Sequence, residues 1–199
     1  MNVVVTGGAG FIGSNLCRAL AADESITNVI ALDDLSTGSR DNLVDAGTET
    51  TDVRLVEGSI LDPELLDEVV GGADAVVHLA ARPSVPRSLA DPMASHLTNA
   101  TGTMEVLEAA RRQGGPQVIV ASSSSVYGAN PTLPKREDMV AVPVSPYAAS
   151  KLAAEAAPLA HGQTHASDQK GHAREQQGHQ VFNHPGLRFV GRPFPVGHP

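Results

Sequence analysis

The stretch VVVTGGAGFIGSNL, residues 3–16, decides the fold expected for this chain. A run of β-branched residues leads into a turn containing Gly7, Gly10 and Gly13, and a helical pattern follows. Glycines at this spacing allow a tight turn, let the backbone approach a bound diphosphate, and let the helix pack closely on the strand. The N-terminus of that helix presents unpaired N–H groups and the positive end of the helix dipole to the anion. The stretch therefore predicts a dinucleotide-binding turn.

An acidic residue follows at the distance that such a turn requires. Asp33 ends the segment NVIALD, about 20 residues after the glycines. Its carboxylate can accept hydrogen bonds from the adenosine ribose and would repel a 2′-phosphate, which predicts NAD rather than NADP as the cofactor. An aspartate that merely ends a strand is the alternative. Asp34 is more ambiguous, and it could face the adenine.

Short β-branched runs alternate with helical periods up to about residue 155. We expect strands at 2–6, 28–33, 53–58, 73–80 and 116–123. We expect helices at 11–22, about 63–70, 92–113, and from near Ser145 onward. Strands that alternate with helices predict an α/β fold, a Rossmann-like, doubly wound parallel sheet with both faces covered.

The composition changes after about Ala157. Residues 157–199 hold six of the eight histidines and five of the seven glutamines, and their apolar residues show no helical period. This composition predicts an irregular, disordered tail. The histidine spacings match no compact metal-ligand pattern and no cysteine accompanies them, so we expect no metal site.

Charge and cysteine content limit the partners and the compartment. A net charge of −8 argues against nucleic acid or an anionic membrane as a partner. We expect neither a membrane span nor a secretion signal, because the sequence has no apolar run of the required length and no basic start. The single cysteine, Cys17, fits a reducing cytoplasm; we interpret it as a packed helix residue, with a reactive thiol as the alternative.

Two later stretches, VASSSSVYG (120–128) and SPYAASK (145–151), carry a possible catalytic set. Tyr147 and Lys151 are four residues apart and therefore share one helix face. A lysine ammonium favours the phenolate and makes Tyr147 a usable base, and it can also hold the nicotinamide ribose. The serine run ends the fifth expected strand, where strand ends form the ligand crevice, and we expect Ser123 to bond the reacting oxygen.

The motifs GGAGFIG, LDDLSTG, VVHLAA, SVPRSLADP, NATGT, SSSSVYG and SPYAASK follow one another along the chain. Over about residues 2–156 the sequence resembles the NAD-dependent sugar-nucleotide epimerases and dehydratases of the extended short-chain dehydrogenase/reductase family. The resemblance implies Ser123, Tyr147 and Lys151 as the catalytic residues. It implies cofactor contacts at Gly7, Gly10, Phe11, Ile12, Gly13, Asp33, Asp34, Ser59, Ile60, Leu79, Ala80, Ala81, Asn99, Tyr147 and Lys151.

The resemblance also bears on the reaction. Family dehydratases usually carry an acidic residue just after the catalytic hydroxyl, where this chain has Ser124 and Ser125. This disfavours a dehydratase, and the segment SVPRSLADP resembles UDP-hexose 4-epimerases. We therefore expect a UDP-hexose 4-epimerase that works through a 4-keto intermediate, with a dehydratase, a non-catalytic NAD-binding module and an inactive fragment as alternatives. Ser59 stands where the family usually has an aspartate that faces adenine, which weakens that contact. His78 is expected to pack within its strand.

Family members continue with a further strand and a domain that binds the nucleotide sugar. The sequence after residue 156 does not match these parts, so we expect a cofactor domain at 1–156 followed by a truncated or frameshifted tail. The family forms dimers through two helices per subunit, here about 92–113 and the helix after Ser145. We expect Pro158 to cut the second helix short, which argues against a dimer.

Overall fold

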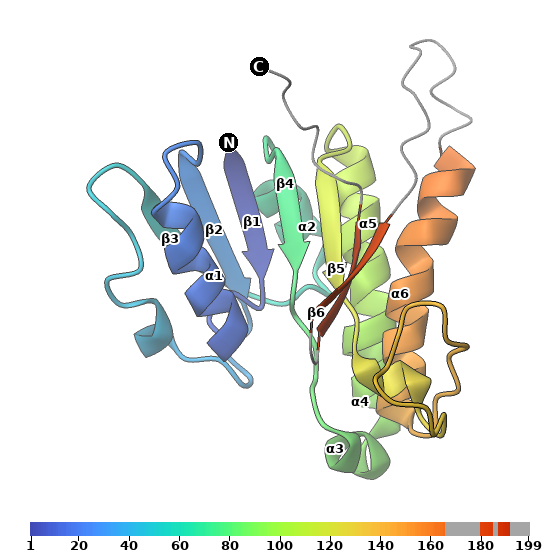
Figure 1. Ribbon diagram of the computed structural model, residues 1–199. Coiled ribbons are helices and arrows are strands. Elements are labelled where there is room, and N and C mark those ends of the chain that lie inside the picture. Colours follow the sequence, from blue (N-terminus) through green and yellow to red (C-terminus); the bar gives the residue numbers. More distant parts are fainter. Residues whose placement is uncertain (166–179, 185–186, 192–199) are drawn as a thin grey trace.

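The computed structural model describes residues 1–165, 180–184 and 187–191 and contains one sheet in the order β3-β2-β1-β4-β5-β7-β6 (Figure 1). Its first five strands are parallel and lie within two residues of the expected bounds. They are β1 (Asn2–Thr6), β2 (Asn28–Asp33), β3 (Asp52–Glu57), β4 (Ala75–His78) and β5 (Gln117–Ala121). The predicted parallel, Rossmann-like sheet is confirmed.

Helices cover both faces of the sheet, as the apolar strand sequences require. Helix α1 (Phe11–Ala21) packs through the fully buried Cys17 on Val3, Val5 and neighbouring strand residues. Helices α2 (Pro63–Val70) and α5 (Gly102–Arg112) cover the opposite face around Leu66 and Val106. Burial raises the pKa of the Cys17 thiol to about 12, as expected for a packed cysteine rather than a reactive one.

The single helix expected at 92–113 is interrupted. A short helix α3 (Val85–Ala90) precedes it, α4 (Pro92–His96) begins at the side-chain cap of Asp91, and a π-helical segment η2 (Leu97–Thr101) leads into α5. Two 3₁₀ turns, η1 (Arg40–Leu43) and η3 (Ser124–Tyr127), complete the connections. The π-helical segment places Asn99 in the interior, and single π turns of this kind are frequent at functional sites.

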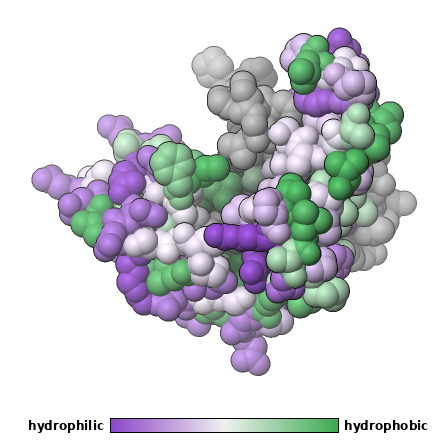
Figure 2. All heavy atoms as spheres, turned by 90° about the horizontal axis from the view of Figure 1, so that it is seen from below, coloured by the Kyte–Doolittle hydropathy of each residue, from purple (hydrophilic) through white to green (hydrophobic). Residues whose placement is uncertain are grey.

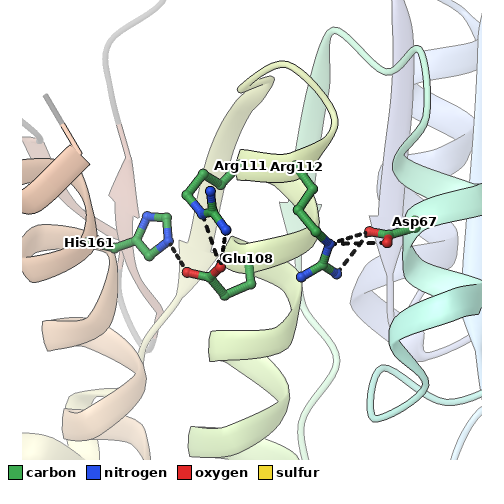
Figure 3. Close-up of polar contacts among 5 residues, drawn as sticks. All are labelled: Asp67, Glu108, Arg111, Arg112 and His161. Atoms are coloured by element: carbon green, nitrogen blue, oxygen red, sulfur yellow. Dashed lines mark hydrogen bonds and ion pairs between the residues drawn. The ribbon is translucent and has the colours of Figure 1, made fainter. Parts of the chain in front are cut away.

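The expectation that Pro158 ends its helix is wrong. Helix α6 runs from Pro146 to His165 with Pro158 inside it. Proline removes one backbone hydrogen bond, at a cost of about 3 kcal/mol, but Ala154 and Pro158 are buried and His161 contacts Glu108 of α5 at 2.8 Å (Figure 3). Tertiary packing therefore carries the helix past the proline. Neither α6 nor any other helix in the described part of the chain is long and apolar enough to cross a membrane.

The segment after residue 156 is not irregular throughout. Its first residues belong to α6, and strands β6 (Gln180–His184) and β7 (Leu187–Gly191) extend the sheet. Strand β7 pairs antiparallel with β5, and β6 pairs antiparallel with β7. The expectation of disorder is wrong for these stretches; for 166–179, 185–186 and 192–199 it lies outside the described residues.

Candidate cofactor and catalytic site

The predicted site residues gather at the carboxyl ends of the parallel strands. The glycine turn follows β1, Asp33 ends β2, Leu79 follows β4, and Ser123 lies just beyond β5. The strand order places the topological switch between β1 and β4, which is where ligands bind in such sheets. Figure 2 looks at the molecule from this side, and it shows hydrophobic side chains exposed beside strongly hydrophilic ones.

The glycine turn is hydrogen-bonded to β2 and lies close to the segment that follows β4. Gly7 has a φ of +72° and donates its N–H to Leu32 O at 2.7 Å. A Cβ at Gly7 would lie 2.7 Å from Ala80 N, and one at Gly13 would lie 2.1 Å from Gly7 O. Any side chain at these two positions would collide with backbone atoms. The spacing of the glycines is therefore a packing requirement of this turn.

The first turn of α1 is open to a ligand. Its N-cap, Gly10, has no side chain that could accept from the helix amides, and a Cβ there would meet Gly7 O at 3.2 Å. The N–H groups of a first helical turn have no intrahelical acceptor. Phe11 is 83% exposed and Ile12 is 45% exposed beside them. This end of α1 can take an anion such as a diphosphate.

Asp33 is a buried anion set against the glycine turn. Its Oδ2 accepts from Ala9 N and its Oδ1 accepts from Leu35 N, both at 2.9 Å. Each carboxylate oxygen keeps a second acceptor site for ribose hydroxyls. Asp34 is exposed, and its Oδ1 accepts from the N–H and the hydroxyl of Ser36, so this carboxylate is bound by its own loop.

The segment after β3 serves mainly to pack. Ser59 Oγ accepts from Leu61 N at 3.1 Å, which uses part of its capacity to bond a base. Ile60 is 5% exposed and lies against the first residue of α5, because a Cβ at Gly102 would come within 2.5 Å of its Cδ1. The structure thus places Ile60 beneath α5.

The loop after β4 borders the glycine turn and is joined to α6. Leu79 N donates to Thr6 O, and Ala80 N donates to Thr6 Oγ1. The buried Asn99 accepts from Arg82 N at 2.7 Å and donates from Nδ2 to Ser150 Oγ at 2.9 Å. Asn99 thereby links the segment that contains Ala81 to α6.

Lys151 joins α6 to the end of β5. It is 5% exposed, and its Nζ donates to Ala121 O at 2.6 Å, two residues before Ser123. Burial lowers the pKa of Lys151 from 10.5 to about 8. Tyr147 is half-buried one helical turn earlier, on the same face. The structure therefore brings the predicted Tyr-Lys pair to the strand end that carries Ser123.

Ser123 is oriented by its own 3₁₀ turn. Its Oγ accepts from Ser125 N at 3.2 Å and from Ser125 Oγ at 2.9 Å. A hydroxyl has two acceptor sites and one proton. Since both contacts use Ser123 as an acceptor, its proton is left to donate to a ligand oxygen.

The sequence reasoning did not identify two supporting side chains. Glu155 is 7% exposed and accepts from Ser122 Oγ at 2.8 Å, one helical turn beyond Lys151. Ser150 donates to Tyr147 O at 2.8 Å. The four-residue spacing of Lys151 and Glu155 was a usable signal, whereas nothing in the local sequence pointed to Ser150.

The model of the NAD dependent epimerase/dehydratase family matches residues 3–169, which is most of the chain. The chain belongs to this family. The resemblance noted from the motifs is thereby confirmed, and the family is one of NAD-dependent enzymes.

Its relatives in this family include both epimerases and dehydratases. A UDP-glucose 4-epimerase of Azospirillum brasilense is 42% identical over 155 residues, covering 77% of this chain and 42% of the relative. A dTDP-glucose 4,6-dehydratase of Streptomyces niveus is 40% identical over 173 residues, covering 84% and 51%. The chain spans about half the length of the curated relatives it matches.

Solved structures of the family show the same fold. The dTDP-glucose 4,6-dehydratase DesIV of Streptomyces venezuelae, with NAD and TYD bound, matches with a TM-score of 0.77 and 38% identity over 83% of this chain and 53% of that one. The UDP-glucose 4-epimerase of Brucella ovis in complex with NAD gives 0.72 and 36%, covering 82% and 48%.

Proposed function

We propose that this chain binds NAD⁺ at the carboxyl ends of β1, β2 and β4 and carries the catalytic set of a UDP-hexose 4-epimerase. The observation that carries the proposal is the buried Lys151, held on Ala121 O at the end of β5 and one helical turn from Tyr147. A buried ammonium is unfavourable without a use for its charge, and this one lies on the helix face that carries Tyr147 and bonds the strand end that leads to Ser123.

The residues present fit the cofactor. Gly7 and Gly13 leave room only for backbone, the first turn of α1 is open, and Asp33 places an anion at the end of β2. We infer that the diphosphate binds at the start of α1 and that Asp33 bonds the adenosine ribose and repels a 2′-phosphate. When bound, NAD⁺ would accept a hydride from the sugar and return it.

The side chains of the chain would then handle the proton. Tyr147, as the phenolate, takes the proton of the sugar 4-hydroxyl, and the ammonium of Lys151 stabilises the phenolate charge. Ser123 donates its free proton to the same oxygen and polarises it as the carbonyl forms. After the flat 4-keto sugar turns over, the same three groups serve the reverse step, and Tyr147 returns the proton.

A dehydratase is the second candidate, because relatives of that class match this chain about as well. Elimination of water needs an additional acid and base next to the reacting carbons. The two residues after Ser123 are Ser124 and Ser125, which supply neither. This favours the epimerase.

A calorimetric titration of the chain with NAD⁺ and with NADP⁺ tests the cofactor site. We expect saturable binding of NAD⁺ and little of NADP⁺, and we expect Asp33→Asn to narrow that difference. If neither dinucleotide binds, the proposal is wrong. Incubation of the NAD⁺ complex with UDP-galactose, followed by NMR, then separates the reactions: UDP-glucose indicates epimerisation, a 4-keto-6-deoxy sugar indicates dehydration, and no product indicates a non-catalytic module.

We also infer that the chain pairs with a second copy of itself. The family resemblance implies that the pairing uses the helical stretch at about 92–113 and the helix after Ser145, which is α6. Leu89, Met93, Leu97 and Met104, which lie on α3 to α5, are between 44% and 66% exposed. Helix α6 continues past Pro158 to His165, so an early end of this helix does not argue against the pairing. Light scattering tests this: Met93→Glu should convert a dimer to a monomer, whereas a monomeric parent chain would contradict the inference.

A further inference from the structure

A buried chain of hydrogen bonds runs through His78, the last residue of β4. His78 Nδ1 lies 2.6 Å from Thr6 Oγ1 on β1, and His78 Nε2 lies 3.0 Å from Thr103 Oγ1 on α5. Thr103 Oγ1 in turn donates to Asn99 O at 2.6 Å. All four residues are at most 2% exposed. This network of hydrogen bonds therefore crosses the interior from β1 to the π-helical segment η2.

The donors in this network of hydrogen bonds determine which nitrogen of the His78 ring carries the proton. Thr103 has one hydroxyl proton and gives it to Asn99 O, so Thr103 Oγ1 must accept from His78 Nε2. Burial, together with the charge of Lys151, lowers the pKa of His78 to about 3, so the ring is neutral. A neutral ring with its proton on Nε2 must accept at Nδ1, from Thr6 Oγ1. One tautomer satisfies every contact.

Both ends of this network of hydrogen bonds lie in the candidate site. At one end, Thr6 Oγ1 accepts from Ala80 N at 3.3 Å, and a Cβ at Gly7 of the glycine turn would lie 2.7 Å from that amide nitrogen. At the other end, Asn99 Nδ2 donates to Ser150 Oγ, and Ser150 donates to Tyr147 O. The side chains of Thr6, His78 and Thr103, the backbone carbonyl and side chain of Asn99, and the Ser150 hydroxyl thus connect the glycine turn to the first turn of α6.

We propose that His78 is a positioning residue that couples the seat of the cofactor diphosphate to the turn of α6 that carries Tyr147. It touches no reacting atom. It acts by fixing α5 and Asn99 relative to β1 and β4, so that a displacement at the glycine turn is passed to Tyr147 and back. The catalytic meaning of this coupling rests on the proposed function, but the coupling itself is a property of the ligand-free chain.

Hydrogen exchange in a matched pair of variants tests the coupling. Thr103→Val removes the hydroxyl that links His78 to Asn99. Thr51→Val removes an equally buried hydroxyl that donates to Ile26 O at 3.0 Å, away from the chain. We expect amides 146–152 of the ligand-free protein to exchange roughly three- to tenfold faster in Thr103→Val than in Thr51→Val, the factor for one lost hydrogen bond. Equal exchange in the two variants would overturn the proposal.

Two further measurements keep the test decisive. The ¹⁵N shifts of the His78 ring in the parent chain should show a neutral ring protonated on Nε2 at neutral pH; a proton on Nδ1, or an imidazolium, would contradict the proposal without any variant. His78→Gln, which can still donate toward Thr103, should exchange amides 146–152 as slowly as the parent chain. His78→Leu should exchange them faster. A parent chain that binds no NAD⁺ would contradict the proposed function and leave the exchange comparison intact.

Discussion

The two sides of the candidate site are built by different means. The side that would hold the diphosphate consists of backbone: Gly7 and Gly13 are required because backbone atoms lie where their Cβ atoms would be. The side that carries Tyr147 is held by buried polar side chains, with Lys151 on Ala121 O and Glu155 on Ser122. The side made of backbone should lose stability when a side chain adds volume. The side made of buried polar contacts should lose stability when one hydrogen-bonding atom or one proton is changed.

The largest effect is expected from added volume in the backbone seat. Gly13→Ala should destabilise the chain by about 4 kcal/mol or more, because its Cβ would lie 2.1 Å from Gly7 O. Gly10→Ala is the matched control, since its Cβ would meet the same oxygen at 3.2 Å; it should cost about 1 kcal/mol. Denaturant unfolding measures both. Similar losses in the two variants would show that the seat is not limited by volume.

The buried polar side chains should make the free energy of unfolding fall in acid. The pKa of His78 is about 3 in the folded chain and 6.5 in the unfolded chain, so between these values the unfolded chain binds more protons. The free energy of unfolding should therefore fall as the pH drops below 6.5, by about 4 kcal/mol in total near pH 3. His78→Gln should remove this dependence, and His96→Gln, at an exposed site, should retain it. An unchanged pH profile in His78→Gln would contradict the assignment.

The buried ammonium of Lys151 should lower the free energy of unfolding while it contributes to NAD⁺ binding. Its pKa of about 8 lies below the unfolded value of 10.5, so its contribution to the free energy of unfolding rises with pH between these values. Lys151→Met should remove that rise and stabilise the ligand-free chain at pH 7 by up to about 3 kcal/mol, while it weakens NAD⁺ binding. Thermal unfolding and calorimetry measure the two effects. A destabilised Lys151→Met chain would mean that the ammonium is well compensated by Ala121 O.

The smallest effect is expected beyond Pro158. His161→Ala removes the contact with Glu108 and should cost about 1 kcal/mol, because the His161 side chain is 13% exposed. Arg111 contacts the same carboxylate from a side chain that is 45% exposed, so Arg111→Ala should cost less (Figure 3). Unfolding in denaturant ranks the two. The reverse order would show that α6 is not held to α5 through His161.

The sequence predicted the backbone side of the site well. Glycine spacing, the β-branched run before it and the acidic residue at the end of β2 are local signals, and the structure places Gly7, Gly13 and Asp33 at one strand edge. The pairing of Tyr147 with Lys151 could also be predicted, because residues four apart lie on one helix face. Their assignment as catalytic and cofactor-binding residues stays a prediction.

The supporting contacts could not be predicted, because they join residues that are distant in the sequence. Ser122 and Glu155 are 33 residues apart, and Asn99 and Ser150 are 51 apart. The rule that proline ends a helix failed at Pro158 because burial of that turn offsets a cost of about 3 kcal/mol. The strands β6 and β7 were missed since they lie in a stretch with a polar, histidine-rich composition.

The burial of Cys17 gives the chain a built-in reporter. It is the single cysteine among 199 residues, it lies on the buried face of α1, and its pKa of about 12 leaves almost no thiolate at neutral pH. A thiol reagent can modify the folded chain only when the helix that follows the glycine turn opens. The labelling rate therefore counts the openings of that helix, and a dinucleotide seated at its first turn should slow the labelling.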